Sequence, residues 1–234
     1  MVSRIWRNPL TAAFPTSKPV TPFQPEDSDQ VRVESLDTPY QGFFRLDRFQ
    51  LRHRLFAGGW TPLLKREILR REYAVGILPY DPLADAVVLV EQFRMGPFVA
   101  GVHPWMLEIP AGVVKPGETL EQVARRETVE ETGCVPARVE RFCDYFPSPG
   151  GCSEAVSLFV AEIRDTGNAG RLHGVADEHE DIQTHILPVP QALALLDADA
   201  YANSATLLAL NWLARHHSAL RQRWQEPPPE NDPG

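Results

Sequence analysis

The stretch Gly112-Val-Val-Lys-Pro-Gly-Glu118, followed by Arg126-Glu127-Thr-Val-Glu130-Glu131-Thr-Gly133, decides the fold of this chain. It indicates a glycine-containing loop that leads into a helix. Glu127 and Glu131 are four residues apart, so they lie on one face of that helix. Like charges at this spacing repel by about 0.2–0.5 kcal/mol, which the helix alone does not recover. A hard divalent cation reverses the sign, because Mg²⁺ takes carboxylate oxygens and substrate phosphates together.

The spacing of these residues resembles the Nudix box, G-x5-E-x7-R-E-U-x-E-E-x-G-U, where U is a bulky aliphatic residue. Every fixed glycine and polar position is matched. Two aliphatic positions depart from the pattern, because they hold Thr128 and Cys134. Both are small enough to be buried, so we interpret them as packing variation. The resemblance implies a Nudix hydrolase, which cleaves a nucleoside diphosphate linked to another group.

The composition is that of a soluble globular protein of 234 residues, with 43% hydrophobic and 23% charged residues. The net charge is −8 and no basic stripe is visible, which argues against a nucleic-acid partner. Three cysteines without zinc spacing predict reduced thiols rather than disulfides. The chain shows neither a signal peptide nor a membrane span. We therefore expect a cytoplasmic protein with no membrane partner.

The chain is predicted to have four segments: a proline-rich N-terminal tail (1–30), an N-terminal β subdomain (31–71), a Nudix hydrolase domain (72–224) and a disordered tail (225–234). In the subdomain, apolar alternation predicts strands over 31–36, 43–52 and 65–69, with a hairpin turn at 57–60.

The larger domain is predicted to have an α/β fold, in which a mixed β-sheet is sandwiched between helices. Apolar β-branched runs predict strands at 73–78, 86–93, 105–109, 139–145, 155–162 and 182–187. Helices are expected at 120–132, 190–196 and 205–224, the first ending at Gly133. The acidic loop 167–181 is long for a compact domain, which favours a functional role.

Residues outside the box resemble the bacterial ADP-ribose pyrophosphatases. Pro149, sixteen residues after Gly133, has the offset of this subgroup. The other similar segments are 42–44, 52–56, 66–68, 78–82, 91–94, 148–151, 153–154 and 176–182. The resemblance implies hydrolysis of ADP-ribose to AMP and ribose 5-phosphate with Mg²⁺, or Mn²⁺ as a substitute. It also implies a homodimer in which the N-terminal subdomain is exchanged or shared, so that one subunit completes the substrate site of the other.

The resemblance also assigns roles to individual residues of this chain. The implied metal ligands are the Ala111 carbonyl, Glu127, Glu131 and Glu180, with Glu130 at a further metal. The implied general base is Glu178, although His179 beside it also has a suitable pKa. The box residues with a structural role are Gly112, Glu118, Arg126 and Gly133.

The implied substrate contacts lie in both domains. They are Phe43 and Phe44 around adenine, Arg66, Glu67, Arg71 and Arg94 at polar groups, Val113 in the box, and Ser148, Gly150 and Glu154 near the terminal ribose. Strand alternation places Phe43 and Phe44 on opposite faces, so we expect at least one of them in a core.

Two alternatives stay open. A Nudix hydrolase for another sugar nucleotide, such as GDP-mannose, would keep the box and change the flanking contacts. A Nudix-fold sensor would bind ADP-ribose without turnover. Such sensors tend to lose box glutamates, whereas Glu127, Glu130 and Glu131 are present here. A working enzyme is therefore the prediction.

Overall fold

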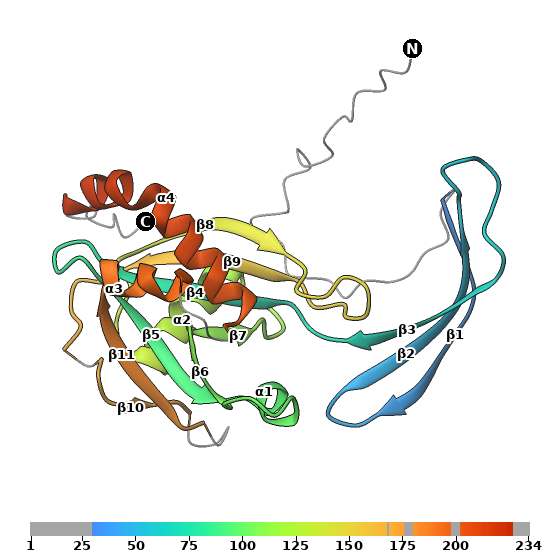
Figure 1. Ribbon diagram of the computed structural model, residues 1–234, viewed down its shortest axis with the longest axis horizontal. Coiled ribbons are helices and arrows are strands. Elements are labelled where there is room, and N and C mark those ends of the chain that lie inside the picture. Colours follow the sequence, from blue (N-terminus) through green and yellow to red (C-terminus); the bar gives the residue numbers. More distant parts are fainter. Residues whose placement is uncertain (1–29, 168, 176–179, 198–201, 227–234) are drawn as a thin grey trace, which may run out of the picture.

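The structure is a computed structural model that describes residues 30–167, 169–175, 180–197 and 202–226. Its strands form two separate sheets, a small one built by the N-terminal residues and a large one in the rest of the chain (Figure 1). The small sheet lies to one side of the large domain and joins it where β3 leads into β4. None of the helices in the described ranges is both long and apolar enough to span a membrane.

The N-terminal sheet is antiparallel, in the order β1 (Val31–Gln41), β2 (Arg45–His53) and β3 (Leu64–Arg70). The predicted hairpin turn is present between β2 and β3. Gly58 and Gly59 have φ values of 91° and 81° there, a region in which glycine meets no Cβ penalty.

The expectation for the two phenylalanines is wrong. Phe43 and Phe44 belong to the bend between β1 and β2 instead of to a strand, so period-two alternation does not apply to them. Their rings pack edge to face with centroids 4.9 Å apart, and they are 90% and 41% exposed. Neither one is a core residue of this chain.

The large sheet has the strand order β10-β11-β5-β4-β9-β8, with β6 paired to β5 and β7 paired to β4. β4 and β9 are parallel and their other neighbours are antiparallel, so the predicted mixed sheet is confirmed. The strands are β4 (Ala74–Asp81), β5 (Ala86–Phe93), β6 (Trp105–Glu108), β7 (Ala111–Val113), β8 (Arg138–Tyr145), β9 (Val156–Glu162), β10 (Leu172–His173) and β11 (Ile182–Pro188).

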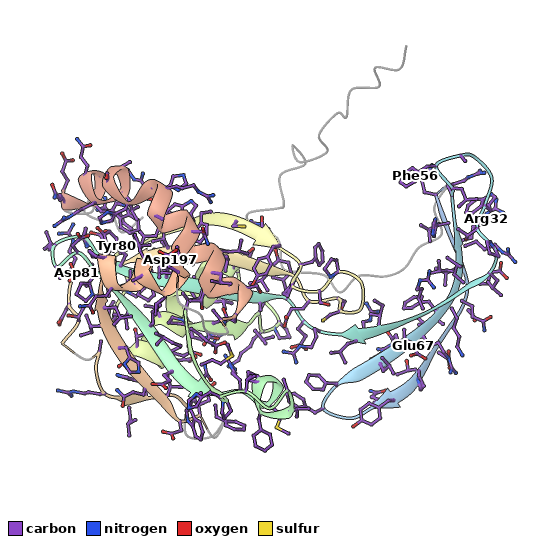
Figure 2. The ribbon with its side chains drawn as sticks, in the orientation of Figure 1. Arg32, Phe56, Glu67, Tyr80, Asp81 and Asp197 are labelled. Atoms are coloured by element: carbon purple, nitrogen blue, oxygen red, sulfur yellow. The ribbon has the colours of Figure 1, made fainter. Side chains whose placement is uncertain are left out.

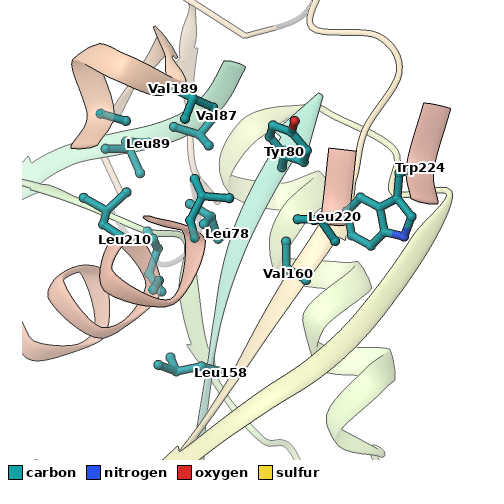
Figure 3. Packing of buried hydrophobic residues seen from close by; sticks show 14 of the residues in the cluster. Leu78, Tyr80, Val87, Leu89, Leu158, Val160, Val189, Leu210, Leu220 and Trp224 are labelled. Carbon is teal, nitrogen blue, oxygen red and sulfur yellow. The ribbon is translucent and has the colours of Figure 1, made fainter. Parts of the chain in front are cut away.

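Helices cover both faces of this sheet: α2 (Leu120–Thr132) on one, and α3 (Val189–Ala194) and α4 (Ser204–Gln225) on the other. Val123 and Ala124 of α2 pack on Val75 and Ile77 of β4. On the opposite face, residues of the sheet and of α4 pack together in one hydrophobic cluster, which includes Leu78, Tyr80, Leu158, Leu210, Leu220 and Trp224 (Figure 3). The predicted sandwich follows from this alternation along β4 and β9.

Three short elements were not predicted from the sequence: α1 (Met95–Val99), β7 and β10. Each has five residues or fewer, which is too short for apolar periodicity to appear. A single 3-10 turn, η3 (Leu195–Asp197), extends α3. The bounds of α2 agree with the prediction because both ends carry local signals. Thr119 and Gln122 form a capping box, and Gly133 ends the helix with φ 68°.

Candidate active site

The box loop brings β7 and α2 together through hydrogen bonds of its own residues. Glu118 accepts a hydrogen bond from the Lys115 amide at 2.9 Å, which closes the turn before α2. A Cβ at Gly112 would overlap the carboxylate of Glu127, so glycine lets that carboxylate keep its place against the strand. The loop and the acidic face of α2 are therefore one unit, in which Gly112 and Glu118 hold positions that the sequence predicted to be structural.

Arg126 lies at the centre of the box carboxylates. Its guanidinium donates to Glu118 at 2.8 Å, to Glu127 at 2.6 Å and to Glu130 at 2.9 Å. It also donates to the carbonyl of Val113 at 3.3 Å. Burial works against the Arg126 charge, but these carboxylates outweigh it and raise the pKa of Arg126. One cation thus orders the loop and two of the box glutamates.

The acidic face of α2 carries more negative charge than Arg126 compensates. Burial, and then the neighbouring charges of Glu127 and Glu180, raise the pKa of Glu131 well above its ordinary range. Burial also raises the pKa of Glu127, in spite of Arg126. In the described chain, Glu131 accepts one hydrogen bond, from the Ala111 amide at 3.2 Å, and has no ion pair. The sequence-predicted acids Glu127, Glu131 and Glu180 therefore act on one another as neighbours.

The loop that carries Glu180 rests on α2. The Gly174 amide donates to the Glu130 carbonyl at 3.4 Å, and the Val175 amide donates to the Glu180 carboxylate at 3.1 Å. A Cβ at Gly174, which has φ 106°, would meet Glu180. These contacts bring Glu180 to the helix across about fifty residues of sequence. The predicted general base Glu178 and its neighbour His179 lie outside the described residues.

The donor set fits a hard divalent cation. Carboxylates and a backbone carbonyl are the ligands that such an ion takes, and the excess negative charge at Glu131 is what it would neutralise. As the side chains stand, no three acidic, histidine or cysteine side chains in the described ranges are grouped to hold a metal. Arg126 and the Ala111 amide engage oxygens of Glu127 and Glu131 in this arrangement. Those oxygens would have to turn toward the ion.

A second cluster joins the N-terminal sheet to the loop after β8. The Arg71 guanidinium lies 5.1 Å from the centre of the Phe44 ring and 3.4 Å from Glu154. Ser153 binds the backbone of Arg71. Its hydroxyl accepts a hydrogen bond from the Arg71 amide at 2.9 Å and donates one to the Arg71 carbonyl at 3.1 Å. The Leu69 amide also donates to the Gly151 carbonyl at 2.9 Å. The predicted substrate residues Phe44, Arg71 and Glu154 are thus brought together within one chain.

Other predicted substrate residues are not brought to the carboxylates. Arg66 and Glu67 lie on β3, where the Arg66 guanidinium donates to its neighbour's carbonyl. Figure 2 places Glu67 on the N-terminal sheet, away from the large domain. Ser148 and Gly150 belong to the turn beside Gly151, where the Ser148 carbonyl accepts from the Gly151 and Cys152 amides.

Sequence reasoning missed two residues with defined partners at this site, Ser153 and Glu108. Ser153 holds Arg71, and Glu108 forms an ion pair of 2.7 Å with Arg94. Neither has a spacing pattern. For Ser153 the available signal was the resemblance of the segment 153–154, which carried no role for the serine, and for Glu108 it was a charged residue near the end of an apolar strand.

The fold and the box geometry define the class of protein. The chain belongs to the Nudix family, because the NUDIX domain model matches residues 70–210. The members of this family that are hydrolases generally use a divalent metal, in agreement with the carboxylate cluster.

Individual proteins of known name are similar to this chain over most of its length. The ADP-ribose pyrophosphatase of Escherichia coli K12 is 41% identical over 210 residues, which cover 90% of this chain and 98% of that protein. The ADP-ribose pyrophosphatase of Haemophilus influenzae is 36% identical over 214 residues, 89% of this chain and 97% of the relative. The GDP-mannose pyrophosphatase of Citrobacter koseri is 37% identical over 157 residues, 67% of this chain and 80% of the relative.

A solved structure described as "Crystal structure of ADP compounds hydrolase" has a TM-score of 0.60 to this chain. It is 19% identical, and the match covers 82% of this chain and 98% of that one. At this identity the likeness establishes the fold.

Proposed function

We propose that this protein is a cytoplasmic Mg²⁺-dependent ADP-ribose pyrophosphatase, which hydrolyses ADP-ribose to AMP and ribose 5-phosphate. The observation that carries the proposal is that Glu127, Glu131 and Glu180 lie near enough to act on one another at the acidic face of α2, where Arg126 does not compensate all of the negative charge. Relatives named ADP-ribose pyrophosphatase, similar over nearly their whole length and including the N-terminal sheet, support the choice of substrate.

In this proposal each group has a defined task. The Ala111 carbonyl, Glu127, Glu131 and Glu180 hold Mg²⁺, with Glu130 at a further ion and Mn²⁺ as a substitute. The bound metal supplies an activated water and neutralises charge on the diphosphate. Arg126 keeps Glu127 in place through its 2.6 Å hydrogen bond.

The substrate would extend from the carboxylates toward the N-terminal sheet. Arg94 binds diphosphate oxygens beside Val113, and Phe43 and Phe44 flank the adenine. Ser148, Gly150 and Glu154 contact the terminal ribose, and Glu154 is held beside Arg71. Glu178 takes the proton from the attacking water, on the same loop as Glu180.

Hydrolysis of a substrate panel tests this function. Purified protein with Mg²⁺ is offered ADP-ribose, GDP-mannose, NADH and diadenosine polyphosphates, and the nucleotide released from each (AMP, or GMP from GDP-mannose) is measured. We expect a strong preference for ADP-ribose, and a loss of about 10²-fold or more in kcat for Glu178→Gln, because a general base contributes that much. A preference for GDP-mannose would replace the substrate and keep the Nudix chemistry. Binding of ADP-ribose without turnover would make the protein a sensor.

We further propose that the protein is a homodimer in which the N-terminal subdomain of one subunit contacts the substrate site of the other. The 90% exposure of Phe43, and the position of Glu67 away from the carboxylates, support this. Arg66 and Glu67 would then serve the partner's site.

Mixing two impaired variants tests the exchange. Arg66→Ala keeps an intact box and Glu131→Gln keeps an intact sheet, so a mixed dimer contains one complete site. Unfolding and refolding equal amounts together should return about a quarter of the wild-type activity, because half of the dimers are mixed and one site in each is complete. Activity no higher than the mean of the two separate variants would show that Arg66 acts within its own chain.

A further inference from the structure

Glu108 is a buried carboxylate at the end of β6 to which neither the box nor the acidic loop assigns a role. Its residue is 3% exposed. One carboxylate oxygen accepts from Arg94 Nε at 2.7 Å, and the other accepts from Asn203 Nδ2. A buried carboxylate is stable only when its oxygens are bonded in this way, so Arg94 and Asn203 are required partners.

The N-terminus of α4 supplies the Asn203 contact to Glu108. Asn203 is the N-cap of α4, and its side-chain oxygen accepts from the Thr206 amide at 2.7 Å. The Thr206 hydroxyl in turn accepts from the amide of Ile109, the residue after Glu108, at 3.0 Å. Two hydrogen bonds therefore join the first turn of α4 to the end of β6, and the orientation of the Asn203 amide is set by the cap.

Arg94 uses only part of its guanidinium for this contact. The side chain is 41% exposed, and within the described residues its sole bonded partner is Glu108, through Nε. The edge formed by Nη1 and Nη2 has the geometry that binds phosphate oxygens in pairs. The Arg94 charge also acts on Glu131, so Arg94 lies near the box carboxylates.

We propose that Glu108, held by Asn203, is a positioning residue that fixes the Arg94 guanidinium with its Nη1–Nη2 edge toward the diphosphate of the substrate. The inference rests on the proposed function and adds to it a residue that acts through Arg94. A flexible arginine side chain loses conformational entropy when the substrate binds, and this cost weakens the affinity. The hydrogen bond to Glu108 orders the Arg94 side chain before the substrate arrives.

Substrate binding without turnover tests whether Glu108 acts through Arg94. ADP-ribose is titrated calorimetrically in EDTA into the wild type, Arg94→Ala, Glu108→Gln and the double variant. We expect Kd to rise about tenfold for Arg94→Ala and about threefold or more for Glu108→Gln, since charge-assisted hydrogen bonds are lost or weakened. Because Glu108 acts through Arg94, the double variant should bind like Arg94→Ala alone.

Two matched variants separate positioning from simple stability. Glu162 is also buried and lies between two arginines, Arg138 and Arg164, in the same domain. Glu162→Gln should lower the melting temperature and leave Kd at the wild-type value. Asn203→Ser keeps a good N-cap, removes the amide donor to Glu108 and adds no charge, so it should raise Kd like Glu108→Gln.

The outcomes distinguish this inference from the proposed function. A wild-type Kd for Glu108→Gln, or additive effects in the double variant, would overturn the inference. The wild type could bind ADP-ribose tightly, in a way that depends on Arg94, and yet release no AMP with Mg²⁺. That result would contradict the proposed function and leave the inference about Glu108 and Arg94 standing. A wild type that hydrolyses ADP-ribose with a KM that Glu108→Gln leaves unchanged would overturn the inference about Glu108 alone.

Discussion

The two sheets of this molecule differ in how much of themselves they bury. Seven of the eight residues of β4 and all seven of β9 are buried, because helices cover both faces of the large sheet. In the N-terminal sheet, β1 and β3 have no buried residue, and β2 buries only Asp47 and Phe49. The difference teaches that the large domain has its own core, whereas the small sheet lacks one.

The small sheet relies on polar contacts in place of a core. Arg32 and Arg54 both lie 4.2 Å from the centre of the Trp60 ring, and Arg48 pairs with Asp37 across β1 and β2. Contacts of this kind contribute about 0–1 kcal/mol each when exposed. A three-stranded sheet held in this way gains stability from any surface that covers it, which agrees with the proposed exchange between subunits.

The largest expected effect is a leucine truncation in the core. Leu158→Ala in β9 should lower the free energy of unfolding by about 2–5 kcal/mol, because Leu158 is fully buried and leaves a cavity. The matched variant Leu36→Ala in β1 should change it by about 0.5 kcal/mol or less, since Leu36 is 40% exposed. Urea unfolding followed by circular dichroism measures both.

A large effect of Leu36→Ala would break the comparison. It would mean that β1 is covered in solution, and the effect should then fall when the protein is diluted below its dimerisation constant. An effect that stays large in the diluted monomer would instead show that the small sheet has a core of its own.

The same contrast governs what could be predicted from the sequence. The buried strands and α2 were predictable because apolar runs, a capping box and Gly133 are local signals. The box carboxylates were predictable because Arg126, Glu127 and Glu131 have a fixed spacing. Phe43 and Phe44 were placed wrongly because the bend at Gly42 interrupts the alternation that β2 would otherwise continue.

The long-range partners could not be predicted. Glu108 meets Asn203, and Arg71 meets Ser153, across 95 and 82 residues of sequence. Such contacts depend on how β6 packs against α4 and how β3 pairs with the loop at Cys152. One sequence without an alignment carries no signal for pairings of this kind.

A smaller effect is expected at Asp47, the buried carboxylate of the small sheet. Asp47 accepts from Thr38 at 2.8 Å, from Arg45 at 2.7 Å and from Arg70 at 2.8 Å, so it links β1, β2 and β3. Asp47→Asn leaves all three donors without a charged acceptor and turns an NH₂ group toward at least one of them. We expect it to destabilise the small sheet by about 1–3 kcal/mol and to leave the large domain unchanged. Hydrogen exchange of β2 and β9 amides, compared between variant and wild type, measures the two regions separately.

The pH dependence of this effect sharpens the comparison. Burial disfavours the Asp47 charge, but the hydrogen bonds from Arg45, Thr38 and Arg70 outweigh it and hold its pKa below the ordinary value of 3.8. Because the pKa of Asp47 is lower in the folded than in the unfolded state, its carboxylate stabilises the fold fully at pH values above the unfolded-state pKa. This stabilisation is lost as the pH falls through the folded-state pKa. The difference in β2 protection between wild type and Asp47→Asn should therefore be constant from pH 7 to about 4.5 and shrink below pH 4. A difference that stays constant down to pH 2.5, or that appears equally in β9, would show that the Asp47 charge does not hold this sheet together.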